Sequence, residues 1–130
     1  MKKRNLIFFT YVLFVLTACS TTIPVRNYMD QTIPQYGNSE VSSTLVERSI
    51  IKGAISLGWQ TKIIKSGLIE ATLNIRTHQL VVLISHDEKN YSIEYKDSIN
   101  LKYNGKKIHR QYVNWVNNLI NAINAENIRA

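Results

Sequence analysis

The hydrophobic pattern of this 130-residue chain is most regular between residues 69 and 76, where apolar and polar side chains alternate. The apolar positions are Ile69, Ala71, Leu73 and Ile75, and the polar positions between them are Glu70, Thr72, Asn74 and Arg76. A period of two residues is typical of a β-strand, because successive side chains of a strand point to opposite faces of the sheet. The pattern therefore predicts a strand with one buried face and one wet face.

Three further segments are predicted to be strands, at residues 59–65, 80–86 and 91–96. The segment 80–86 is almost entirely apolar, which indicates either a central strand covered on both faces or a strand with one face in contact with something else. In the segment 91–96, apolar or aromatic residues again alternate with polar residues. The turns between the strands are too short for crossover helices, so we expect an antiparallel four-stranded meander. Residues 99–103 would prolong the sheet, and Asn104-Gly105 is a tight-turn signal.

Two segments have apolar residues at the three- and four-residue spacing of amphipathic helices. The first helix is predicted over residues 43–57, with Thr44 and Glu47 as a capping box and Gly58 as a left-handed C-cap. The apolar stripe of the second is Ile108, Tyr112, Trp115 or Val116, Leu119, Ile120 and Ile123. The order helix, four strands, helix predicts an α+β two-layer sandwich, with the meander flanked by an N-terminal and a C-terminal helix on one face.

We expect residues 42–130 to form this single α+β domain, and residues 19–41 to be a flexible tether. The tether contains both prolines of the chain, Pro24 and Pro34, and no apolar periodicity, so it cannot bury enough surface to fold alone. The alternative is an ordered arm that lies against the domain through the apolar side chains around Tyr28 and Ile33.

The N-terminal region has the pattern of a secretory signal. A basic start, Lys2-Lys3-Arg4, precedes an apolar run over residues 6–16, which is shorter than the roughly 20 residues that a spanning helix needs. The run ends in Leu16-Thr17-Ala18-Cys19, which resembles the lipobox of bacterial lipoproteins. Residues 1–18 are therefore expected to be a lipoprotein signal peptide, and Cys19 the lipidated residue that attaches the protein to a membrane.

Cys19 is the only cysteine of the chain. A lone thiol in an oxidising compartment has no internal disulfide partner, and lipidation would consume it. The lipobox resemblance also implies a location. Since Ser20, and not Asp, follows the cysteine, we expect the periplasmic side of the outer membrane in preference to the inner membrane.

The net charge is +7, and removal of the three basic residues of the signal leaves +4. This mild excess does not indicate nucleic-acid binding. The only compact basic group is Lys102, Lys106, Lys107 and Arg110. It is interpreted as a solvated turn and helix start, with contact to anionic lipid or glycan head groups as the alternative.

Candidates for chemistry are few. The histidines, His78, His86 and His109, have no i, i+4 pair and no second cysteine to complete a metal site, so neither a metal nor another cofactor is expected. Asp97, Ser98 and His109 are the one set from which a nucleophile constellation could be assembled. No glycine-rich phosphate loop and no G-x-S-x-G sequence is present.

After the predicted signal peptide, most aromatic residues lie in the second half of the chain. Trp59 and Trp115 are best explained as core residues, and the tyrosines as core residues with polar tips at the edge. The sharper hypothesis is an exposed patch that recognises a partner, and the candidate partner surface is Tyr103 with Lys106 and Lys107.

Several stretches of the chain resemble a group of small bacterial lipoproteins without assigned activity. These are Gly58-Trp59, residues 69–71, 91–101, 108–109 and 112–119. The resemblance implies an exported lipoprotein with an α+β domain, and it implies no catalytic residue. We therefore expect a lipid-anchored, non-enzymatic envelope protein that binds a protein, peptidoglycan or glycolipid. The alternative is a small envelope hydrolase that uses His109 with Asp97 or Ser98.

Overall fold

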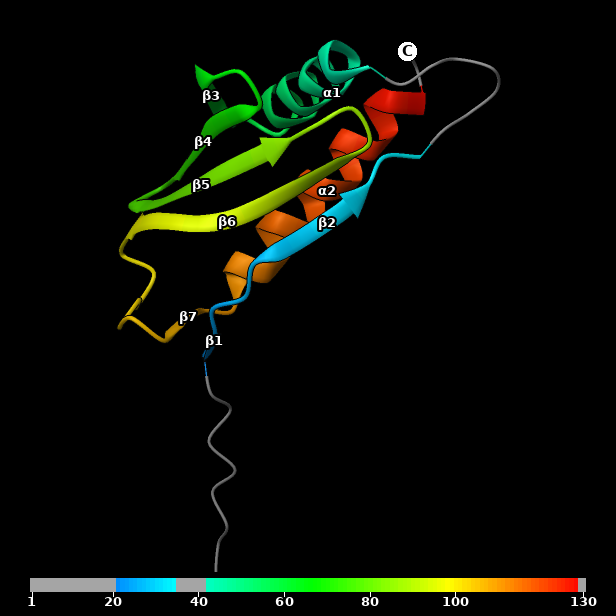
Figure 1. Cartoon of the computed structure of the whole chain (residues 1–130). Helices are drawn as coiled ribbons and strands as arrows, with labels where there is room; N and C mark the ends of the chain where they lie inside the picture. The colour runs from blue at the N-terminus through cyan, green and yellow to red at the C-terminus, as the bar shows by residue number, and fades with distance from the viewer. Residues whose placement is uncertain (1–20, 35–41, 129–130) are drawn as a thin grey trace, which may run out of the picture.

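The computed structural model describes residues 21–34 and 42–128. The predicted signal peptide 1–18, Cys19, Ser20 and the 35–41 part of the predicted tether lie outside the described residues. The fold is α+β, with a five-stranded antiparallel sheet, a small two-stranded sheet and two helices in the described part of the chain. Both helices lie on one face of the larger sheet (Figure 1).

The larger sheet has the strand order β2-β6-β5-β4-β3. Its consecutive strands are β3 (Gln60–Lys65), β4 (Leu68–Ile75), β5 (His78–His86) and β6 (Asn90–Ile99). These are the four strands predicted from the alternating pattern, with β6 longer than expected. The turn between β4 and β5 contains only Arg76 and Thr77, and Arg76 adopts a φ of 55°. A two-residue turn of this kind joins neighbouring antiparallel strands directly.

The fifth strand, β2 (Tyr28–Thr32), comes from the segment predicted to be a tether. It pairs with β6, while β1 (Thr22–Pro24) pairs with β7 (Lys107–His109). The expectation of a flexible tether is therefore wrong for residues 21–34. The ordered-arm alternative describes them better, because Tyr28 and Ile33 are buried in the core and the backbone between them is paired along a sheet edge.

The first helix, α1 (Ser43–Ser56), begins close to its predicted start, but its cap differs from the prediction. The N-cap is Ser42, whose hydroxyl oxygen accepts a hydrogen bond from the backbone N–H of Leu45 at 3.2 Å. Thr44 lies inside the first turn, where its side chain cannot fill the capping role. Gly58 has the left-handed backbone expected after the helix, with a φ of 85°.

The second helix, α2 (Gln111–Ile128), begins later than its apolar stripe indicated. Ile108 is buried as a residue of β7, because pairing with β1 at Ile23 holds this segment extended. The remaining stripe faces the core: the fully buried side chains of α2 are Tyr112, Val116, Leu119 and Ile123. Trp115 is only partly buried and packs at the margin of the core, whereas Trp59 is a core residue as predicted.

The face of the sheet toward the helices carries the core. Alternate residues of the two central strands are buried: Ile69, Ala71 and Leu73 of β4, and Leu80, Val82 and Ile84 of β5. Their neighbours Val81 and Leu83 lie half-buried on the face that has no helix (Figure 1). The apolar run of β5 thus has one face in the core. Its other face is covered only by side chains of the neighbouring strands.

Candidate interaction surface

The candidate partner surface lies at the end of the molecule where β1 pairs with β7. After β6 the chain turns through Asn100 and Lys102, both with positive φ (57° and 54°). Asn104 then closes a tight turn, since its side-chain oxygen accepts hydrogen bonds from the backbone N–H groups of Lys106 (3.0 Å) and Lys107 (2.8 Å). The predicted Asn104-Gly105 turn is confirmed, and it fixes the two lysines at the start of β7.

Tyr103 projects from the same loop and is 44% exposed. Its ring packs on that of Tyr95, with the centroids 4.4 Å apart, and Tyr95 packs in turn on Tyr112 of α2 at 6.1 Å. The exposed ring is therefore supported by a row of aromatic side chains that leads into the core. A side chain held in this way loses little conformational freedom when it binds a partner.

The backbone enters the described domain at this surface. The carbonyl oxygen of Thr21 accepts a hydrogen bond from the backbone N–H of Arg110 at 3.0 Å. Its hydroxyl oxygen accepts one from Nζ of Lys102 at 3.3 Å. Directly after β1, the backbone N–H of Val25 donates to the carbonyl oxygen of Lys106 at 2.9 Å. Residues 21–25 are thus hydrogen-bonded to the segment that carries the basic group.

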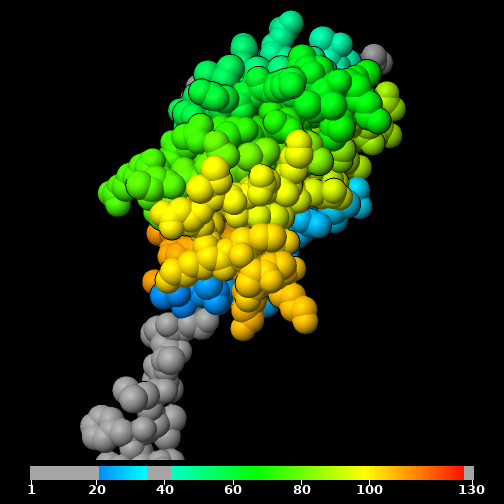
Figure 2. Space-filling view, turned by 90° about the vertical axis from the view of Figure 1, so that its left-hand side faces the viewer, coloured from blue at the N-terminus to red at the C-terminus, as the bar shows by residue number. Residues whose placement is uncertain are grey.

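We call the group Lys102, Tyr103, Lys106, Lys107 and Arg110 the basic end. All five residues are exposed. The segment that carries them, yellow to orange in Figure 2, lies beside β1, in blue. The ion pairs of the described residues lie elsewhere, between Lys96 and Glu70 and between His86 and Glu47. The four cations of the basic end therefore have no carboxylate neutralising them among the described residues.

Asp97, Ser98 and His109 do not form a catalytic constellation in the structure. Nδ1 of His109 accepts a hydrogen bond from the backbone N–H of Gln111 at 3.1 Å. The carboxylate of Asp97 accepts one from the backbone N–H of Ser98 at 2.8 Å. The Ser98 hydroxyl shares a hydrogen bond with the Tyr95 hydroxyl at 2.7 Å. Each group is thus bonded to a local partner, and no hydrogen bond joins His109 to Asp97 or to Ser98 in the described part of the chain.

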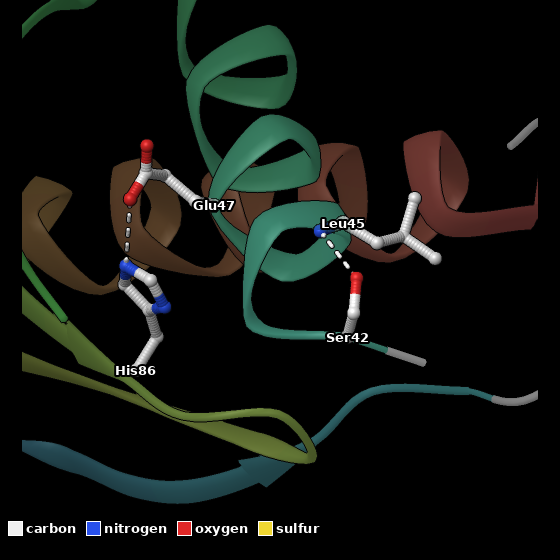
Figure 3. Close-up of polar contacts among 4 residues, drawn as sticks. All are labelled: Ser42, Leu45, Glu47 and His86. Atoms are coloured by element: carbon white, nitrogen blue, oxygen red, sulfur yellow. Dashed lines mark hydrogen bonds and ion pairs between the residues drawn. The ribbon is translucent and has the colours of Figure 1, made fainter. Parts of the chain in front are cut away.

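Of the other two histidines, His78 lines the same surface pocket as His109, and His86 lines a different one. His78 places Nδ1 2.6 Å from the carbonyl oxygen of Asn100, beside the ring of Trp115. His86 has a fully buried side chain whose Nε2 lies 3.7 Å from Oε2 of Glu47 (Figure 3). Neither ring nitrogen of His86 has a hydrogen-bond partner among the described residues. No three metal-ligating side chains gather anywhere in residues 21–34 and 42–128.

The His86–Glu47 contact was missed by the sequence analysis. The sequence pattern places Glu47 in a predicted capping box and His86 at the end of the strand predicted over residues 80–86. The two residues are 39 positions apart on α1 and β5, and only the packing of the helix on the sheet brings them together. No local pattern signals such a contact.

The buried tyrosines are structural. Burial raises the pKa of Tyr91 and Tyr112 far above the ordinary value. The Tyr91 hydroxyl donates to the side-chain oxygen of Asn124 at 2.9 Å, and that of Tyr112 donates to the carbonyl oxygen of Arg26 at 2.8 Å. These phenols are neutral hydrogen-bond donors at physiological pH, so neither can act as a phenolate base.

The fold and this surface together define a small α+β domain with a basic, tyrosine-bearing end, against which Thr21 lies. No family model, curated protein or solved structure matches the chain. Neither helix of the described residues is long and apolar enough to cross a bilayer.

Proposed function

We propose that this protein is a lipid-anchored bacterial envelope protein, attached through Cys19, which acts by binding and not by catalysis. The observation that carries the proposal is the position of Thr21 at the basic end, two residues after Cys19. The candidate anchor and the candidate binding surface are therefore neighbours in space as well as in the sequence.

The support for the anchor is in the sequence. A basic start, an apolar run of signal length and a single cysteine after Leu16-Thr17-Ala18 form the lipoprotein pattern. Several acyl chains on Cys19 would give effectively permanent attachment, because each buried CH₂ contributes about 0.8 kcal/mol. Ser20 favours the periplasmic side of the outer membrane.

The support for binding is in the surface. Tyrosine and arginine are among the residue types that dominate interface energy, and Tyr103 and Arg110 are both exposed at the basic end. The lysines add positive charge that has no carboxylate ion-pair partner among the described residues. His109, Asp97 and Ser98 make separate local hydrogen bonds, so no observation favours the hydrolase alternative.

The anchor is tested by labelling cells with a fatty acid analogue. We expect the wild-type protein to incorporate the label and partition into detergent, and Cys19→Ala to lose both properties. The comparison with wild type is well matched, because Cys19→Ala removes only the thiol group and leaves residues 21–128 unchanged. Equal labelling of the two proteins would contradict the lipid anchor.

The binding surface is tested by complementation of a deletion strain, with crosslinking to envelope components as a second readout. We expect Tyr103→Ser and the double variant Lys106→Gln/Lys107→Gln to weaken complementation and to lower the crosslinking yield, at unchanged melting temperature. The double variant Lys62→Gln/Lys65→Gln removes the same charge from β3 and should leave both readouts intact.

A further inference from the structure

We infer that the basic end binds the anionic head groups of the membrane that holds Cys19, so that this end faces the bilayer. The inference rests on the proposed lipid anchor and names the ligand of the same surface. It assigns Lys102, Lys106, Lys107 and Arg110 to lipid phosphates, and Tyr103 to the interfacial layer.

The first step is the length of the connection. Two residues separate the α-carbons of Cys19 and Thr21 by at most about 7 Å, whatever their conformation. Thr21 itself is held by Arg110 and Lys102 through hydrogen bonds of 3.0 and 3.3 Å. A lipid on Cys19 would therefore bring the basic end close to the head groups.

The second step is the range of the electrostatic attraction. At physiological ionic strength the Debye length is about 8 Å, so a cation farther than this from the bilayer gains little. The connection of about 7 Å keeps Thr21, and with it the Lys102 ammonium group that donates to its hydroxyl oxygen, within that range. A tether of some twenty extended residues would have held the domain several nanometres away, and the pairing of β1 with β7 removes that freedom.

The third step is the chemistry of the surface. Its exposed ammonium and guanidinium groups have no carboxylate ion-pair partner in the described part of the chain, so they are available to phosphodiester oxygens. Tyrosine is enriched at membrane interfaces, where its ring lies among the head groups and its hydroxyl stays hydrated. The exposed ring of Tyr103, supported by Tyr95, has this amphipathic character.

The orientation follows from the fold. The end formed by α1 and β3 lies opposite to β1 and β7 (Figure 1). With the basic end on the bilayer, α1 and β3 point away from the membrane. Lys62 and Lys65 of β3 are exposed there. They are suitable control positions, because they carry the same charge as Lys106 and Lys107 but lie at the end that faces away from the bilayer.

The experiment uses the chain from residue 19 to residue 130 with Cys19→Ser, so that binding cannot depend on a lipid on Cys19. This stretch contains every residue of the described core, from Tyr28 to Ile123. Partition is measured into vesicles of phosphatidylcholine and into vesicles of phosphatidylcholine and phosphatidylglycerol in equal amounts. We expect binding to the mixed vesicles only, with a decrease at high salt.

Each surface cation contributes about a fivefold factor to the affinity for an anionic bilayer. Lys106→Gln/Lys107→Gln should thus lower partition into the mixed vesicles about 25-fold. Lys62→Gln/Lys65→Gln, assayed at a concentration at which it is monomeric, should change partition little. Equal partition into both vesicle types, or equal losses in the two double variants, would overturn the inference. So would binding to peptidoglycan or to an envelope protein that needs Lys106 and Lys107 while the vesicles bind nothing.

The result is independent of the lipid anchor. If the vesicles bind as expected but cells do not acylate Cys19, the basic end is a lipid-binding surface and the proposed anchor is wrong. If Cys19 is acylated but partition is the same for both vesicle types and for all variants, the proposed anchor is supported and the inferred orientation is wrong.

Discussion

Gly53 of α1 lies against the backbone of Ile123 in α2. A Cβ atom at position 53 would be 2.7 Å from the amide nitrogen of Ile123 and 2.8 Å from its α-carbon. Real Cβ atoms do not approach backbone atoms this closely, so the two helices can cross at this point only because residue 53 has no side chain. The crossing lets both helices share one face of the sheet.

Gly53→Ala should destabilise the domain although alanine is the better helix former. The propensity gain is about 1 kcal/mol, whereas overpacking at a fixed contact costs typically about 1–3 kcal/mol and more when backbone must move. We expect a net loss, measured as a lower midpoint in urea unfolding. Asn118→Ala, at an exposed position of α2, is the control and should be neutral or stabilising. A Gly53→Ala variant as stable as wild type would mean that the helices are farther apart than described.

Leu73 and Thr72 are neighbours on β4 with opposite environments. Leu73 is 5% exposed on the helix-covered face, and Thr72 is on the face without helices. Leu73→Asp buries an unpaired carboxylate, which costs several kcal/mol and is enough to unfold a domain whose total stability is about 5–15 kcal/mol. Thr72→Asp should cost much less. Comparable melting temperatures of the two variants would show that the faces of β4 are assigned wrongly.

Buried tyrosines should make the domain sensitive to alkali. Burial raises the folded-state pKa of Tyr91 above its unfolded value of about 10. The neutral phenol therefore stabilises the fold fully below pH 10, and this contribution is lost as the pH rises further. Each such group adds a slope of about 1.4 kcal/mol per pH unit in this range.

Tyr91→Phe removes one of these groups and should make the decline above pH 10 less steep. At neutral pH it should cost about 1 kcal/mol, because the hydrogen bond to Asn124 is lost. The measurement is the free energy of unfolding from urea titrations between neutral pH and strong alkali. Parallel curves for wild type and Tyr91→Phe would show that Tyr91 is not protected from ionisation by burial.

His109→Ala and Ser98→Ala should leave the cellular role intact, because the two side chains make separate local contacts. Complementation of a deletion strain is the readout, and melting temperature shows that each variant is folded. Loss of complementation at unchanged stability and unchanged envelope association would instead favour the hydrolase alternative.

The strands β3 to β6 could be predicted because their alternation is a local property of the sequence. The faces of β4 were assigned correctly for the same reason. β1 and β2 were missed because each is held by a partner distant in the chain: Ile23 opposite Ile108, and Tyr28 opposite Ile93. Neither segment has enough apolar residues of its own to signal a strand.

The helix start was misplaced at Ile108 because its spacing to Tyr112 fits a helix, while pairing with β1 decides the local conformation. The surface residues Tyr103, Lys106 and Lys107 could be chosen from residue type and turn chemistry alone. The position of Thr21 among them could not be predicted, since the hydrogen bonds to Lys102 and Arg110 span more than 80 residues.

β3 forms one edge of the larger sheet, and two large apolar side chains, Ile63 and Ile64, are exposed on it. Such an edge is a template for pairing with an identical strand. In the antiparallel register that sets Ile63 against Ile64 of a second copy, Lys62 of one strand comes opposite Lys65 of the other. The resulting like-charge repulsion disfavours this register, so Lys62 and Lys65 weaken the pairing of two β3 edges when copies of the protein are crowded.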